Sequence, residues 1–216
     1  FIANKRATFA TPLPLRTMLA ELGVLKAELG RSYRDAMNRI FRPADAAPGP
    51  LHQALADLRC RLVLTANIDQ LIEKADPARQ MFTWRQAPDL LSDLDDGRDV
   101  LFKVHGSVET LNSLVMTQDE YDTASRDEPY QRTLSHLLQR YSFLFVGFSL
   151  VDPLDLERIL ESNARAFEHA ARPHFALLKS PVGSNADRWR DVFNVHTIEY
   201  PDHGDVIDVL RRLKTA

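Results

Sequence analysis

Polar side chains follow the apolar run Leu62–Leu64 at the point where it gives way to a helix-like segment. Thr65, Asn67 and Asp69 stand here with one apolar residue between each pair. Amide and carboxylate groups in a cleft can hold hydroxyl groups or an amide of a ligand. The same side chains can serve the backbone instead, Asp69 as a cap of the following helix and Asn67 within its own turn. Both interpretations stay open at this point.

Two further apolar runs end in polar segments of the same kind. His105 and Gly106 follow the run DVLF, and Gly147, Phe148 and Ser149 follow the run SFLF. His105 is the side chain of this set that exchanges protons near neutral pH. Gly147 would let the backbone approach a phosphate closely, and Ser149 can donate a hydroxyl. The alternatives are a structural histidine, a positive φ at Gly106 and tight packing at Gly147.

The elements that must position these residues form an alternating pattern of strands and helices. Apolar runs predict strands within residues 60–67, 81–86, 99–106, 112–117, 142–148, 174–179 and 195–200. Helical periodicity predicts helices at residues 15–29, 31–41, 51–58, 69–75, 129–141, 152–170 and 205–215. Apolar strands that do not alternate, separated by helices, indicate an α/β fold with a parallel sheet covered on both faces. Ligands bind such sheets at the carboxyl ends of the strands, so the three polar segments are expected to converge there.

The composition narrows the class of protein. The 216 residues suit one domain of α/β size, with 44% hydrophobic and 26% charged residues. A net charge of −3 and a pI near 6.2 argue against direct nucleic-acid or acidic-membrane binding. No apolar stretch is long enough for a membrane span. The chain opens on Phe1 without a secretory core, which predicts a cytoplasmic protein and a piece of a longer gene product.

Cys60 is the one cysteine of the chain. It excludes an intramolecular disulfide and any multi-cysteine zinc site, and we expect no metal. Because Cys60 precedes a strand-like run, a buried thiol is favoured over a nucleophile.

In their order and spacing, these segments resemble the sirtuin-like family, specifically the bacterial sirtuin-like NAD-hydrolysing domains found in antiphage defence proteins. LTANID, KVHGS and FVGFSLVDP match the family's T-x-N-x-D, K-x-H-G and G-[FTY]-S-x-x-D-P turns. VMTQDEY (residues 115–121) matches a further stretch, and HFALLK and VHTIEY look like the closing strands. The resemblance covers about residues 60–214.

The resemblance implies a Rossmann-like sheet that binds NAD and cleaves the bond between nicotinamide and ribose. His105 would be the general base on water or a ribose hydroxyl, and Asn67 would hold the nicotinamide ribose or the attacking water. Asp69 would face the carboxamide. Cleavage passes through an oxocarbenium-like state, which needs close polar contacts rather than a strong nucleophile. The predicted NAD-binding residues are Thr65, Asp69, Gly106, Gly147, Phe148 and Ser149.

The sequence departs from the family pattern in three respects. The single cysteine cannot build the four-cysteine zinc module of the deacetylases, and Ala66 stands where they have glutamine. Both differences favour a hydrolase or a binder over a deacetylase. The glycine-rich pyrophosphate loop is also missing, because that region reads Ala3-Asn4-Lys5-Arg6-Ala7. Without glycines, backbone amides cannot approach phosphates as closely.

Residues 1–216 are therefore predicted to form a single sirtuin-like NAD-binding domain with a helical segment at about residues 15–58. The leading hypothesis is an NAD glycohydrolase, the effector of a bacterial antiviral defence system, controlled by a sensor domain, a partner protein or homo-oligomerisation. The alternative is a degenerate module that binds a nucleotide or a partner protein without turnover. The helical segment could be a lid, a dimer face or a cover for the sheet. Plain or cyclic ADP-ribose could be the product.

Overall fold

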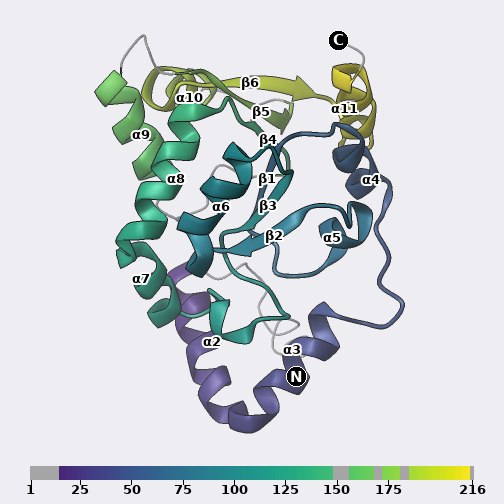
Figure 1. Ribbon diagram of the computed structural model, residues 1–216, viewed down its shortest axis with the longest axis vertical. Helices are drawn as coiled ribbons and strands as arrows, with labels where there is room; N and C mark the ends of the chain where they lie inside the picture. Colours follow the sequence, from purple (N-terminus) through teal and green to yellow (C-terminus); the bar gives the residue numbers. More distant parts are fainter. Residues whose placement is uncertain (1–14, 148–155, 168–171, 181–184, 215–216) are drawn as a thin grey trace.

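The computed structural model describes residues 15–147, 156–167, 172–180 and 185–214, and it has an α/β architecture (Figure 1). The helices are α2 (Leu15–Leu29), α3 (Tyr33–Phe41), α4 (Pro50–Asp57), α5 (Leu71–Ala75), α6 (Ala87–Asp95), α7 (Gln118–Arg126), α8 (Glu128–Arg140), α9 (Leu156–Phe167), α10 (Asn185–Phe193) and α11 (Val206–Lys214). The strands are β1 (Leu62–Thr65), β2 (Gln80–Thr83), β3 (Val100–Lys103), β4 (Leu144–Phe145), β5 (His174–Lys179) and β6 (Val195–Tyr200).

All strand pairs of the described chain are parallel. One sheet has the order β1-β3-β2, and the other has the order β4-β5-β6. In the first sheet, β3 is central and places Lys103 opposite both Thr65 and Thr83. Helices connect most successive strands, as parallel pairing requires. The predicted parallel, Rossmann-like sheet is therefore confirmed.

Helices cover both faces of the strands because neighbouring side chains on a strand point to opposite faces. On β5, Ala176 packs in the core that includes α6, α8, α9 and α10, and Leu177 packs with α4 and α11. The same division separates Phe145 from Leu144 on β4. Figure 1 shows α8 and α9 on the left of the strands and α4 and α11 on the right. The prediction of a sheet covered on both faces is confirmed.

The segment from residue 15 to residue 58 is helical and has two structural roles. Helix α4 packs on β5 and β6 through Ala54. Helix α3 lies at the other end of the molecule, where Met37 joins a buried cluster with Ile68, Val108 and Leu114. Met37 is 1% exposed. Helix α3 therefore covers the segments that follow β1 and β3.

Two predicted strand regions do not form as expected. Residues 112–117 contain no strand, because Leu111–Ser113 is a 3-10 helix and Thr117 caps α7. The strand predicted within residues 81–86 ends at Thr83, whose N–H donates to Gln86 Oε1 at 3.2 Å. In both places, a local cap or 3-10 turn satisfies backbone groups that a strand would have paired.

The expectation of a buried thiol at Cys60 is wrong, because Cys60 is exposed. The preceding residue, Arg59, has φ +50, and β1 begins only at Leu62. Cys60 therefore belongs to the turn before the strand rather than to the sheet. The helix predicted at residues 152–170 has Pro153 in its first turn, and this residue lies outside the described part of the chain.

His174 is buried at the start of β5 among aromatic rings. Its ring centroid lies 5.9 Å from that of Phe143 and 6.2 Å from that of Phe145, and its Nδ1 accepts the N–H of Phe143 at 3.1 Å. Burial lowers the pKa of His174 from 6.5 to about 4. The folded chain therefore holds this imidazole neutral.

We expect His174 to make stability depend on pH in the acid range. Its folded pKa is below its unfolded pKa, so its contribution is complete above pH 6.5 and is lost as the pH falls towards 4. Between pH 7.5 and 4.5 the loss should be about 2–3 kcal/mol of unfolding free energy. His174→Asn keeps an acceptor for the N–H of Phe143 but cannot titrate, so denaturant unfolding should show a smaller loss in this variant. Equal pH dependence in parent and variant would contradict the assignment.

Candidate functional site

The segments that follow β1 and β3 lie side by side at the carboxyl edge of the first sheet. The N–H of Val104 donates to the carbonyl of Thr65 at 3.0 Å, and the N–H of Val108 donates to the carbonyl of Ile68 at 2.9 Å. These two bonds continue the β1–β3 pairing into the turns. The structure thus brings together the turn that carries Asn67 and the turn that carries His105, as the sequence predicted.

The turn after β1 leaves the side chain of Asn67 available. The backbone N–H of Asn67 donates to Thr65 Oγ1 at 3.1 Å, and Asp69 Oδ1 accepts the N–H of Leu71, the first residue of α5, at 2.9 Å. Thr65 and Asp69 therefore shape the turn and the helix start. Asn67 is exposed, and its side-chain amide makes no hydrogen bond within the described part of the chain. A ligand can use this amide without displacing a protein contact.

The turn after β3 depends on glycine. His105 is half-buried, and its carbonyl accepts the N–H of Val115 at 3.0 Å. Gly106 has φ +79, and a Cβ there would lie 2.0 Å from the carbonyl oxygen of Ser113. The expected positive φ at Gly106 is confirmed, and close approach of the backbone is a second requirement. Together they fix the direction in which the chain leaves His105.

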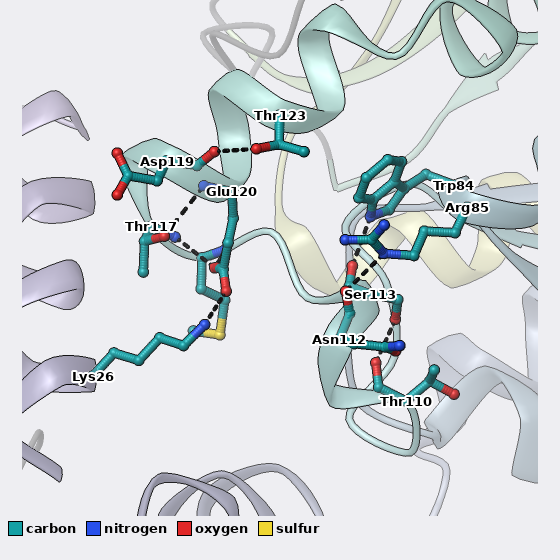
Figure 2. A network of polar contacts seen from close by, with 11 residues as sticks. Lys26, Trp84, Arg85, Thr110, Asn112, Ser113, Thr117, Asp119, Glu120 and Thr123 are labelled. Atoms are coloured by element: carbon teal, nitrogen blue, oxygen red, sulfur yellow. Dashed lines mark hydrogen bonds and ion pairs between the residues drawn. The ribbon is translucent and has the colours of Figure 1, made fainter. Parts of the chain in front are cut away.

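A loop from residue 107 to residue 113 supports the His105 turn, and two residues after β2 hold it (Figure 2). Trp84 Nε1 donates to the carbonyl of Ser113 at 2.7 Å, and Arg85 Nε donates to the carbonyl of Asn112 at 2.7 Å. Ser113 Oγ also accepts the N–H of Ser107 at 3.0 Å. These contacts were not predicted from the sequence. Trp84 was the residue that could have indicated them, because a buried indole N–H needs a hydrogen-bond acceptor.

The buried side chain of Lys103, at the end of β3, connects β3 to the turn that follows β1. It is 0% exposed, and its Nζ donates to the carbonyl of Asp69 and, at 2.6 Å, to Glu73 Oε1 on α5. In the sequence, Lys103 belongs to the KVHGS segment, but no pattern indicates its partner. Glu73 fits an ordinary position of the amphipathic helix at residues 69–75, so it was not predicted to contact Lys103.

Of the three residues predicted as a site in the third polar segment, the structure describes Gly147. It is exposed with φ +67, and a Cβ there would have no heavy atom of the described residues within 4 Å. Its conformation therefore favours glycine, and no described residue packs tightly against it. Phe148 and Ser149 lie outside the described residues, as does the Ala3–Ala7 loop. Convergence of this third segment with the first two stays a prediction.

Comparison with known proteins gives the family. The sequence profile of the SIR2-like domain matches residues 61–198, a range that contains Asn67, His105 and Gly147. The chain belongs to the SIR2-like domain family. The sirtuin-like resemblance predicted from the motifs is therefore confirmed.

Several relatives of this SIR2-like domain carry the name NAD(+) hydrolase ThsA. The protein from Bacillus cereus (strain MSX-D12) is 32% identical over 204 residues, which are 86% of this chain and 42% of the relative. The protein from Enterococcus faecium is 25% identical over 189 residues, 76% of this chain and 39% of the relative. The protein from Acinetobacter baumannii (strain 532279) is 33% identical over 135 residues, 61% of this chain and 28% of the relative. The chain thus spans less than half the length of these relatives.

The VMTQDEY stretch of the SIR2-like domain forms a capping box that anchors α2. Glu120 Oε2 accepts the N–H groups of Met116 and Thr117 at 2.9 and 3.0 Å, and Oε1 pairs with Lys26 of α2 (Figure 2). Tyr33 lies under Lys26, with Nζ 5.2 Å from the ring centroid. Burial, with a smaller effect from Glu120, raises the pKa of Tyr33 to about 12. This stretch therefore connects the helical segment to the domain.

Neither a metal site nor a membrane span is found in the parts of the SIR2-like domain that the structure describes. Among residues 15–147, 156–167, 172–180 and 185–214, no three His, Cys, Asp or Glu side chains gather so that they could hold a metal ion. No helix within these ranges has the length and apolar character needed to cross a membrane.

Proposed function

We propose that this SIR2-like domain hydrolyses NAD at the bond between nicotinamide and ribose. One observation carries the proposal: the exposed amide of Asn67 and the imidazole of His105 sit on adjacent turns at the carboxyl ends of two paired parallel strands. The name of the relatives, NAD(+) hydrolase, supports the same substrate for this chain.

The proposed chemistry uses the residues in complementary roles. The bond between ribose C1 and the nicotinamide nitrogen breaks, and its electron pair leaves with nicotinamide. Water attacks C1, and His105 takes the proton that the water gives up. Asn67 orients the water or the ribose by hydrogen bonds that strengthen as the oxocarbenium-like state forms. Asp69 uses the oxygen that does not cap α5 to face the carboxamide. Thr65 and Gly106 hold the two turns, and Gly147, Phe148 and Ser149 face the adenosine side.

The setting of this activity is part of the proposal. The domain would act in the cytoplasm as the effector of a bacterial antiviral defence system, with NAD as its ligand and no metal, nucleic acid or membrane. A sensor domain, a partner protein or a second copy of the chain would control it. The supporting observation is that the relatives extend well beyond the matched region, which covers 42% of the Bacillus cereus protein.

A degenerate module that binds a nucleotide without turnover is the second candidate. The observation that favours it is the stretch Ala3-Asn4-Lys5-Arg6-Ala7, which lacks the glycines of a pyrophosphate loop.

A measurement of nicotinamide release from NAD distinguishes the NAD hydrolase from the module that only binds a nucleotide. The parent chain, or the full protein that contains it, should release nicotinamide, and Asn67→Ala should lower the rate by about 100-fold or more because the variant loses a preorganised amide. Thermal stability should stay near that of the parent, because the Asn67 side chain is exposed and makes no hydrogen bond in the described structure.

Asn112→Ala is the matched control. Asn112 is also exposed on a neighbouring loop, and it contributes its backbone carbonyl to the contact with Arg85. Its variant should hydrolyse NAD as the parent does. A parent that NAD stabilises thermally without consumption would support the binding module instead. Absence of both binding and release would contradict both candidates.

A further inference from the structure

Lys103 occupies a position that a buried cation rarely takes without a specific role. Its side chain is 1% exposed, and its ammonium group lies between the carbonyl of Asp69 and the carboxylate of Glu73, with Nζ 2.6 Å from Oε1. Lys103 stands two residues before His105, and Asp69 stands two residues after Asn67. One side chain thus connects the two turns that carry the proposed catalytic groups.

The backbone alone holds these turns together at few points beyond the strands. After the last paired residues, Thr65 and Lys103, the backbone bonds between the two segments in the described structure are those from Val104 to Thr65 and from Val108 to Ile68. Through its side chain, Lys103 adds a contact to the carbonyl of Asp69, the residue that follows Ile68. It also connects β3 to α5 through Glu73.

The ion pair is a costly way to fill this space. A buried ammonium group and a partly buried carboxylate lose hydration, and a well-packed apolar pair of similar volume is often as stable or more stable. Glu73 Oε2 is buried and has no hydrogen-bond partner in the described structure, so the carboxylate serves Lys103 through Oε1 alone. The folded state does not need this ion pair for its stability, and the pair lies between two functional turns. We therefore interpret it as a contact that controls the relative position of these turns.

We propose that Lys103 is a positioning residue for NAD hydrolysis and that Glu73 holds it in place; the catalytic part of this inference rests on the proposed function. Lys103 fixes the Asp69 carbonyl relative to β3, and this sets the separation of the Asn67 amide and the His105 imidazole. Displacements of about 1 Å at reacting groups can cost about 100-fold in rate.

The double variant Lys103→Met/Glu73→Met separates positioning from stability. It removes both charges and keeps apolar volume, so its thermal midpoint should stay within about 3 °C of the parent. Its kcat for nicotinamide release should fall by about 100-fold, with a much smaller change in KM. Hydrogen exchange of the Val104 and Val108 amides should become faster, whereas the Phe175 amide, which is bonded to the Phe143 carbonyl, should not change.

Lys26→Met is the matched control. Lys26 pairs with Glu120, whose side chain is 19% exposed, the same value as for Glu73, but this pair connects α2 to α7 rather than the two turns (Figure 2). The control should keep the parental kcat and the parental exchange at Val104 and Val108. Lys103→Arg keeps a charged donor and should retain more activity than Lys103→Met, which gives a second comparison if the double variant does not fold.

Parental kcat together with parental exchange in the folded double variant would overturn the inference. So would equal activities of Lys103→Arg and Lys103→Met. A parent that releases no nicotinamide would contradict the proposed function instead. In that case, the exchange at Val104 and Val108 still decides whether Lys103 positions the two turns.

Discussion

Replacing His105 with alanine is expected to lower kcat for nicotinamide release by about 100-fold to 10,000-fold, the usual contribution of a general base. KM for NAD should change much less, because the proton transfer belongs to the transition state. The fold should survive, since the contact from Val115 goes to the backbone carbonyl of residue 105 and His105 as a whole is only half-buried. Initial rates across NAD concentrations, together with thermal unfolding, measure both expectations.

Two comparisons make the His105 result specific. His136 lies exposed on α8, so His136→Ala should keep the parental rate. Free imidazole added to His105→Ala should restore part of the lost rate, because a small base can take the place of the missing ring. A variant that cleaves NAD as fast as the parent would show that another group, or none, removes the proton.

The fold could be predicted from the sequence because its signals are local. Runs such as 174–179 and 195–200 are apolar and β-branched or aromatic, and the structure makes β5 and β6 of these ranges. The two wrong strand predictions share one cause. Residues 112–117 and Trp84 look like strand segments, but capping by Thr117 and a 3-10 turn at Trp84–Gln86 satisfy their backbone groups locally.

The site could be predicted only in part. Asn67 and His105 were found because polar residues at strand ends are visible in the sequence, and parallel pairing brings adjacent ends together. The supporting contacts join residues far apart in the chain, as Lys103 with Glu73 and Trp84 with Ser113 do. No local sequence pattern predicts such a pair, because each partner also suits an ordinary structural position in its own strand, helix or loop.

The helical segment illustrates the same limit. Periodicity predicted α2 and α3 but could not say what they cover. The structure places Met37 of α3 in one cluster with Ile68 of the Asn67 turn and Val108 of the loop after His105. Helix α3 therefore covers both functional turns in the described structure, whereas the lid and the dimer face stay predictions.

The loop that follows His105 should respond strongly to Gly106→Ala. The new Cβ would lie 2.0 Å from the Ser113 carbonyl oxygen and 2.4 Å from its carbon, in a residue with φ +79. Left-handed strain costs about 1–2 kcal/mol and overpacking about 1–3 kcal/mol more, so the unfolding free energy should fall by about 2–5 kcal/mol. The clash is with backbone, so the loop must open and weaken the contact from Trp84 Nε1 to Ser113.

Gly30→Ala isolates the contribution of the backbone angle to this loss. Gly30 has φ +49, and a Cβ there would meet no heavy atom of the described residues within 4 Å, so this variant should lose only about 1–2 kcal/mol. Denaturant unfolding of both variants measures the difference, and tryptophan fluorescence should report the environment of Trp84 in Gly106→Ala alone. Equal losses would mean that the loop yields to the new methyl group at little cost. In that case, Gly106 would serve the His105 turn through its positive φ alone, and the close approach to Ser113 would contribute nothing to holding His105.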